Sequence, residues 1–229
     1  MSRGRKNQPP LINGKTIRNF LFFLGICFLA YLFMKNKVSP TKSSTPITEK
    51  MILNRTMEYY YNDVDSIAQS FEIPTSYLLA LIVLECSGKK EVKPRFESHI
   101  YDQLVDARDH GKSFGSITNK QISDADNAAL RNLASSWGPF QLMGYQCIEL
   151  EVFVHHLRGE HSIFWGVYWI KKRYGKYLDK EKYGDAFHIH NTGRPIPLIG
   201  PHRTYDPNYV SRGLAYMEYF EKEINKLYN

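Results

Sequence analysis

The chain has 229 residues, which is long enough for one globular domain with a hydrophobic core and an additional N-terminal segment. Its apolar content of 43% and charged content of 23% are ordinary for a folded protein and exclude a largely disordered chain. The net charge is +7, but five of the positive charges lie in residues 1–18, so +7 − 5 leaves only +2 for the remainder and no nucleic-acid partner is expected.

The N-terminus has the plan of a membrane anchor. Residues 1–18 are basic and contain no acidic side chain, so we expect a cytoplasmic tail. Residues 19–34, NFLFFLGICFLAYLFM, carry no charge. They fall short of the roughly 20 residues of a typical span, but the flanking Arg18 and Lys35 can extend their charged ends to the membrane surface. We predict a single-pass signal anchor at 19–34 and a Pro- and Ser/Thr-rich linker at 35–50.

A cleaved signal peptide is the alternative for the same segment, because it also combines a basic start with a short apolar centre. No pair of small residues at cleavage-site spacing follows the run, since Lys35, Asn36, Lys37 and Val38 come next. This favours an uncleaved anchor with the remainder of the chain outside the cytoplasm.

Residues 51–229 form the predicted domain, and its pattern is mainly helical. Apolar side chains recur at helical spacing over residues 52–71, and Ser76 to Glu85 form an almost wholly apolar helix. Residues 88–136 are polar and mixed, with two or three short elements. Further helices are expected at about 146–158, 161–174 and 206–227. Because no series of alternating strands is present, the predicted fold class is mainly α.

Glu85 is the most informative single residue. It ends the apolar helix SYLLALIVLE and is followed by Cys86, Ser87 and Gly88. An ionised carboxylate is costly to bury in such surroundings, which favours the protonated acid. A protonated carboxylic acid is what the cleavage of a glycosidic bond requires. The structural alternative is a helix-terminal Glu whose side chain reaches water.

The segment SSWGPFQLMG, residues 135–144, is the second signal. It places Gln141 among apolar residues just ahead of an expected helix, as a wall that hydrogen-bonds a polar ligand would. Trp137 offers a ring on which a sugar can stack. The alternative is a tight turn around a core Trp.

The segment AFHIHNTGRP, residues 186–195, is the third. Asn191 before Thr192-Gly193 indicates a turn that places an amide and the His190 imidazole at a cleft edge. His188 and His190 have the wrong spacing for a zinc motif, so neither a metal nor a cofactor is expected.

Cysteine usage is sparse. Cys27 lies in the apolar run, which leaves Cys86 and Cys147 in the domain. These two can form one disulfide in an oxidising compartment, or they can be two small core residues.

These three segments, in this order, resemble parts of lysozyme-like enzymes. LIVLECSGK resembles the catalytic-glutamate segment of soluble lytic transglycosylases and goose-type lysozymes, and WGPFQLMG resembles their Gly-hydrophobe-x-Gln-hydrophobe-Met motif. HNTG resembles their Tyr-Asn-x-Gly motif. The resemblance is strongest to the N-acetylmuramidase family, on the segments KPRFESHIYDQL and SSWGPFQLMG, and it covers roughly residues 74–228. The order and spacing carry it, because no single motif is specific.

The resemblance implies a lysozyme-like α+β fold, with a helical body and a small irregular β-containing lobe at about 89–136 across a substrate cleft. It implies that Glu85 is the general acid and that Gln141 and Asn191 line the sugar-binding groove. Two positions depart from the pattern. Cys86 stands for the usual Ser, and His190 stands for the usual Tyr, which would orient the acid or the substrate.

The implied function is cleavage of peptidoglycan glycan strands at the MurNAc-β-1,4-GlcNAc bond, by a domain on the outer side of the bacterial cytoplasmic membrane. Glu97 and Asp102 are the candidates for a second carboxylate, which hydrolysis requires and a lytic transglycosylase does not. We favour hydrolysis because the resemblance is to muramidases. A non-catalytic peptidoglycan-binding module and a zinc peptidase are the remaining alternatives.

Overall fold

The computed structural model describes residues 46–201 and 203–228. The chain divides into two units, Met1–Pro46 and Ile47–Asn229, and the second contains the fold. The predicted tail and anchor lie outside the described residues. Within the part that the structure describes, no helix is long and apolar enough to cross a membrane. The predicted linker is too long at its C-terminal end, because the first described helix begins at Pro46.

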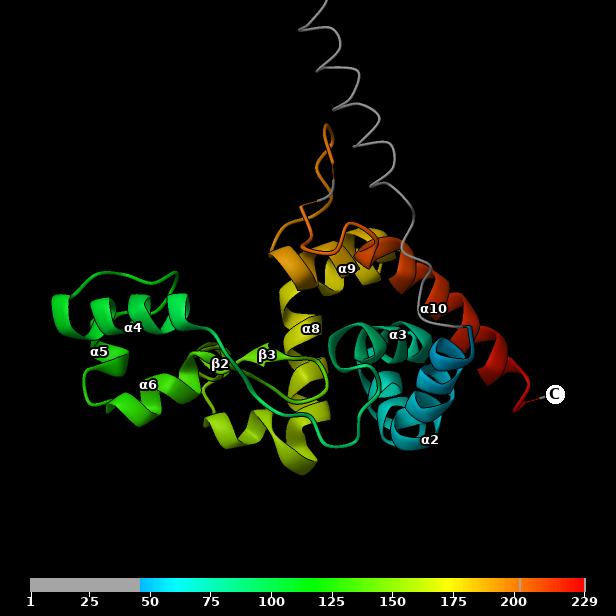
Figure 1. The fold of residues 1–229 in the computed structure, drawn as a ribbon, viewed down its shortest axis with the longest axis horizontal. Coiled ribbons are helices and arrows are strands. Elements are labelled where there is room, and N and C mark those ends of the chain that lie inside the picture. The colour runs from blue at the N-terminus through cyan, green and yellow to red at the C-terminus, as the bar shows by residue number, and fades with distance from the viewer. Residues whose placement is uncertain (1–45, 202, 229) are drawn as a thin grey trace, which may run out of the picture. The chain divides into compact units, whose positions relative to one another are not determined.

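The expectation of a mainly helical domain is confirmed (Figure 1). The body contains five longer helices, which are α2 (Pro46–Phe71), α3 (Thr75–Cys86), α8 (Ser162–Leu178), α9 (Tyr183–Thr192) and α10 (Tyr209–Asn225). Between α3 and α8 the chain forms a smaller lobe and its connections, which contain α4 (Ser98–His110), α5 (Asn119–Ile122), α6 (Asn127–Leu133), α7 (Gln146–Glu149) and the 3-10 helices η1 (Val154–Leu157) and η2 (Gly159–His161).

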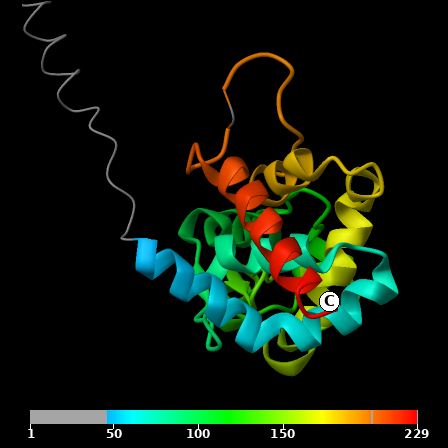
Figure 2. The same ribbon diagram turned by 90° about the vertical axis from the view of Figure 1, so that its right-hand side faces the viewer.

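Helix α3 is the centre of the body. Its residues from Ser76 to Val83 are all buried, so it is apolar around its whole circumference, as a helix surrounded by protein must be. Helix α10 packs along α3 and also contacts α9, which in turn contacts α8. Figure 2 shows α10 in red crossing the front of the body, with α2 in blue and cyan below it. The core is therefore built around the helix that carries Glu85 in its last turn.

The lobe is more helical than the sequence indicates. A three-stranded antiparallel sheet has the order β1 (Arg95–Phe96), β2 (Ser135–Trp137), β3 (Leu142–Met143), with Arg95 opposite Ser136 and Ser136 opposite Met143. The segment between β1 and β2 consists of α4, α5 and α6. The expected β content at 89–136 is thus limited to short strands at the two ends of that segment and an isolated antiparallel bridge between Phe114 and Ile117, and the sheet continues to residue 143.

Two other sequence expectations are wrong in detail. The single helix expected at 146–158 is interrupted after α7, where Glu151 adopts a positive φ of 56° that a helix cannot continue through. The turn expected at Asn191 to Gly193 begins later, because Asn191 and Thr192 are the last residues of helix α9 and Gly193, with a φ of +76°, ends it. Four consecutive residues of this helix, Ala186 to Ile189, are buried, so its sequence shows no helical periodicity.

Candidate active site

Glu85 lies in the last turn of α3, and the segment after it fixes that position. Ser87 ends the helix in the left-handed conformation, and Gly88 follows with a φ of +64°. An Arg55 guanidinium N–H donates to the Ser87 carbonyl. A Cβ at Gly88 would lie 2.0 Å from Thr56 Oγ1, so only glycine allows α2 to pack this closely. The Glu-Cys-Ser-Gly sequence therefore ends the helix immediately beyond the carboxyl group.

The Glu85 carboxyl group is mostly buried and is bonded to a neutral partner. Its side chain is 16% exposed, so it is not a helix-end glutamate that simply reaches water. The hydroxyl of Tyr209, the first residue of α10, donates to Glu85 Oε1. Burial and the nearby Glu85 charge raise the pKa of Tyr209, so this hydroxyl stays protonated. Among the described residues, no lysine or arginine pairs with Glu85.

His190 lies behind the acid rather than in a cavity. Its Nδ1 is 2.8 Å from the Tyr174 hydroxyl, and its Nε2 is 3.0 Å from the Phe140 carbonyl. Nε2 is also 3.8 Å from Glu85 Oε1, which is too far for a hydrogen bond. Burial lowers the pKa of His190, although the Glu85 charge opposes this effect. A neutral imidazole that accepts from Tyr174 and donates to Phe140 satisfies both ring nitrogens, so His190 is not available to orient a substrate.

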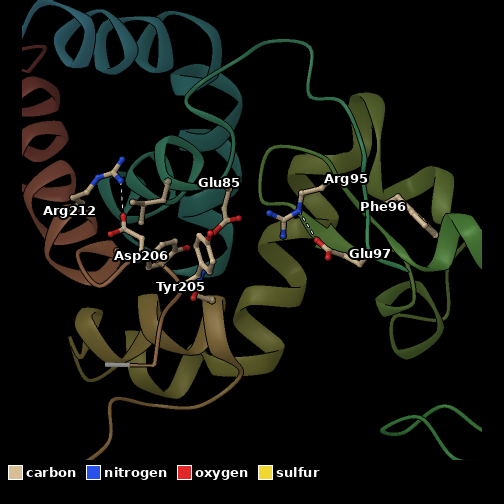
Figure 3. Close-up of a pocket in the computed structure, with 10 residues that line it drawn as sticks. Glu85, Arg95, Phe96, Glu97, Tyr205, Asp206 and Arg212 are labelled. Carbon is tan, nitrogen blue, oxygen red and sulfur yellow. Dashed lines mark hydrogen bonds and ion pairs between the residues drawn. The ribbon is translucent and has the colours of Figure 1, made fainter. Parts of the chain in front are cut away.

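A cavity of about 640 Å³ adjoins Glu85, and we name it the Glu85 cavity. Glu85 lines it from the body, whereas Arg95 and Glu97 line it from the lobe (Figure 3). Asp206 and Arg212 also line it, from the loop before α10 and from α10 itself. The structure therefore brings three carboxyl groups to one cavity.

The three carboxyl groups have different partners. Glu97 Oε1 is 2.7 Å from Arg95 Nε, and Asp206 Oδ2 is 2.9 Å from Arg212 Nη1. Glu85, in contrast, is hydrogen-bonded to an uncharged hydroxyl. Glu97 and Asp206 each have an arginine partner, and Glu85 has none. The cavity thus combines two carboxyl groups that are paired with a cation and one that accepts from a neutral hydroxyl.

Two further cavities each share two lining residues with the Glu85 cavity. One has a volume of about 420 Å³, shares Glu85 and Arg95 with the Glu85 cavity, and also has Gln141 in its lining. The other has a volume of about 780 Å³ and shares Asn191 and Tyr205. Glu85 consequently lines two of three cavities that are connected through shared residues.

Two other predicted site residues, Asn191 and Gln141, line different cavities and differ in their own hydrogen bonding. Asn191 is exposed, at the end of α9, and lines the Glu85 cavity. Gln141 has a positive φ of 49°, its Oε1 accepts from Ser136 Oγ, and its Nε2 donates to the Gly138 carbonyl. Its amide therefore holds its own turn together as well as lining a cavity.

Trp137 and Asp102 do not lie at these cavities. The Trp137 indole N–H donates to the Asn132 carbonyl, and the Arg158 guanidinium lies 5.2 Å from the ring centroid. Trp137 lines none of the three cavities, so the structure gives no support to sugar stacking there. Asp102 is exposed on α4 and is likewise absent from the linings, which leaves Glu97 as the candidate from the lobe.

Sequence reasoning did not identify Tyr205, Asp206, Tyr209 and Arg212. All four lie in or next to the segment that starts α10, where Asp206 Oδ1 accepts from the Asn208 backbone N–H and so organises the turn. Tyr209 is 124 residues from Glu85 in the sequence. The Asp-Pro-Asn turn signal shows that a helix begins there, but no local pattern shows which side chain meets Glu85.

The described part of the chain contains neither a cluster of metal-binding side chains nor a disulfide. No group of three or more His, Cys, Asp or Glu side chains there could hold a metal ion. Cys86 and Cys147 are both free and buried, so the core interpretation is confirmed and the disulfide interpretation is wrong. Burial raises the pKa of both thiols, to about 11 for Cys147, and they remain protonated at neutral pH.

Comparison with known proteins gives no relative: no family model, no curated protein and no solved structure matches this chain.

Proposed function

We propose that this chain is a lysozyme-like muramidase of the N-acetylmuramidase type, which cleaves peptidoglycan glycan strands at the MurNAc-β-1,4-GlcNAc bond with Glu85 as general acid. One observation carries the proposal. Glu85 lies in the last turn of a buried, largely apolar helix, lines the Glu85 cavity and is bonded to an uncharged hydroxyl, with no cation paired to it among the described residues. A carboxyl group in this environment is suited to deliver a proton to a leaving oxygen.

The hydrogen-bond geometry assigns the two oxygens of Glu85 different roles. Oε1 accepts from Tyr209 in either protonation state, whereas Oε2 has no partner among the described residues. In the protonated acid, Oε2 carries the proton and transfers it to the glycosidic oxygen as the bond to the anomeric carbon breaks. The leaving sugar departs as an alcohol, and Glu85 becomes a carboxylate.

The second step distinguishes two reactions. In hydrolysis, water attacks the anomeric carbon and gives its proton to a base, for which Glu97 is the candidate because it faces Glu85 across the same cavity. In transglycosylation, the 6-hydroxyl of the sugar attacks and returns its proton to Glu85. We propose hydrolysis as the reaction. The ion pair between Glu97 and Arg95 is the observation that favours the alternative, because Arg95 competes with a water for that carboxylate.

In this proposal, residues 19–34 anchor the domain to the outer face of the bacterial cytoplasmic membrane. A reporter fused after Asn229 tests this topology, because it should be active only outside the cytoplasm. A soluble form processed near residue 35 would show instead that the segment is a cleaved signal.

Product analysis tests the function itself. Purified sacculi are digested with the chain, and the soluble fragments are examined by mass spectrometry. Reducing ends that incorporate ¹⁸O from labelled water show hydrolysis, and 1,6-anhydro ends show transglycosylation. Binding to sacculi without any fragments would show a non-catalytic wall-binding module and would overturn the proposal.

A further inference from the structure

The cavity of about 780 Å³ is the largest of the three and lies outside the proposed catalytic chemistry. It is formed by the end of α9 and by the loop that joins α9 to α10, which stands out from the body as an arch, drawn in orange in Figures 1 and 2. Asn191 and Tyr205 line both this cavity and the Glu85 cavity. A group bound here is therefore directly beside a ligand at Glu85.

Arg194 and Arg203, near the two ends of the loop, both line this cavity, which we name the arginine cavity. No aspartate or glutamate lines it. Within the described residues, neither guanidinium forms an ion pair or a hydrogen bond with another side chain. Unpaired guanidinium groups at a cavity are suited to bind carboxylates, because the planar fork of N–H donors matches the two carboxylate oxygens.

A single buried imidazole connects the two arginines. His188 Nδ1 is 2.6 Å from the Arg194 carbonyl, and the Arg203 backbone N–H donates to His188 Nε2 at 3.2 Å. The tautomer with its proton on Nδ1 makes both bonds at once. His188 is 1% exposed, so the residue that connects both ends of the loop is part of the core. His188 therefore fixes the backbone positions from which the two exposed arginine side chains line the cavity.

The apolar residues that line the arginine cavity favour anionic ligands that also carry apolar groups. Pro195, Ile196 and Pro197 give the cavity an apolar side, and the Ile196 backbone N–H is held by Asp185 Oδ1 at 3.0 Å. A ligand that fits must combine carboxylates with apolar groups. Short peptides that end in or contain acidic residues have this combination, and such peptides branch from alternate sugars of a peptidoglycan strand.

We propose that the arginine cavity binds a carboxylate of the peptide branch carried by the glycan whose backbone lies at Glu85. This inference rests on the proposed function and extends it, since it makes the chain selective for strands that still carry charged peptides. The selectivity arises because a carboxylate hydrogen-bonded to arginine is bound more strongly than the neutral amide that would replace it.

The experiment compares three soluble substrates with the full-length chain. These are glycan strands with their native peptide branches, the same strands with the peptide carboxylates converted to amides, and strands from which the peptides have been removed. The variant carries Arg194→Ala and Arg203→Ala. The matched control carries Lys120→Ala and Lys176→Ala, which remove two exposed positive charges that line none of the three cavities.

We expect kcat/KM of the unmodified chain to be about tenfold to a hundredfold higher on native than on amide-blocked strands, the range of a charge-assisted hydrogen bond. The ratio should approach one in the arginine variant and stay unchanged in the lysine control. A ratio near one in the unmodified chain, with cleavage of all three substrates, overturns the inference and leaves the proposed function intact. An equal loss on all three substrates in the arginine variant also overturns it, because the arginines would then contact the sugars. No cleavage of any substrate by the unmodified chain overturns both.

Discussion

The body and the lobe each present a glutamate to the same cavity, and the two are held in opposite ways. Glu85 of the body has a side chain that is 16% exposed and accepts from the Tyr209 hydroxyl. Glu97 of the lobe pairs with Arg95, whose side chain is 77% exposed. An exposed ion pair of this kind contributes little to stability. The two glutamates therefore differ in their surroundings, since Glu85 is mostly buried beside a neutral hydroxyl and Glu97 is paired with a cation. In the proposed function, the first is the acid and the second is the base.

Neutralising each glutamate in turn tests whether their different surroundings matter for the proposed reaction. Glu85→Gln should lower the rate of glycan cleavage by about 10²–10⁴-fold, because the amide has no proton to deliver but can still accept from Tyr209. Its thermal unfolding should match that of the original chain. If the variant retains more than about a third of the activity on purified peptidoglycan, Glu85 is not the acid.

Glu97→Gln is the matched change on the lobe. A loss of cleavage activity of comparable size identifies hydrolysis, whereas a small loss of activity supports transglycosylation.

One glycine of the body and one of the lobe differ in the space around them. Gly88 and Gly115 both have a positive φ, of 64° and 58°, but a Cβ would collide with Thr56 only at Gly88 and would meet nothing within 4 Å at Gly115. Gly88→Ala should therefore lower the free energy of unfolding by about 2–5 kcal/mol, from backbone strain plus overpacking.

Gly115→Ala measures the strain alone, and we expect a loss of about 1–2 kcal/mol in denaturant titration. Equal losses at the two glycines would contradict close packing of α2 behind Glu85. Adding Thr56→Ala to Gly88→Ala should recover part of the loss, since it removes the atom that collides.

Tyr209→Phe tests the hydrogen bond from the Tyr209 hydroxyl to Glu85, which in the proposed function orients the acid. Removing one hydrogen bond to Glu85 should lower kcat by about fivefold to tenfold, equivalent to roughly 1 kcal/mol, with KM nearly unchanged because Tyr209 holds the acid rather than the sugar. Tyr101→Phe in the lobe is the control, since the Tyr101 hydroxyl has no hydrogen-bond partner among the described residues. An effect on KM alone would place Tyr209 in substrate binding instead.

Local pattern was enough to predict α3 and its terminal glutamate, because an apolar run that ends at Glu-Cys-Ser-Gly specifies both a buried helix and its end. It was not enough for Tyr209 and Asp206, which reach the cavity through packing of α10 against α3, a contact between distant segments. His190 was misplaced for a related reason. The sequence puts it beside Asn191, but only the fold shows that Tyr174 and Phe140 already occupy both its nitrogens.

Substitutions at Gln141 test whether its amide stabilises the turn between β2 and β3 or binds a ligand. Because its amide already bonds to Ser136 and Gly138, Gln141→Ala should lower the free energy of unfolding by about 1–3 kcal/mol. Gln141→Gly loses the same bonds but tolerates the positive φ of 49°, so it should be more stable than the alanine variant by about 1 kcal/mol. Unchanged stability with weaker binding of a chitin- or muropeptide-type oligomer would instead make Gln141 a sugar-binding residue.

The smallest expected effect is a pH dependence of stability that originates at His190. Burial lowers its pKa below the ordinary value of 6.5, with the Glu85 charge acting in the opposite direction. The unfolded chain therefore binds a proton at a higher pH than the folded chain does, so stability is lost as pH falls below about 6.5 towards the folded value. His190→Gln keeps an acceptor for Tyr174 and a donor for Phe140 but cannot titrate. Its unfolding free energy should fall less between pH 7 and pH 5 than that of the original chain.

The chain has eight histidines, so His161→Gln, at an exposed position, controls for the loss of any one of them. If both variants flatten the pH profile equally, the buried imidazole of His190 is not the cause of the pH dependence of stability.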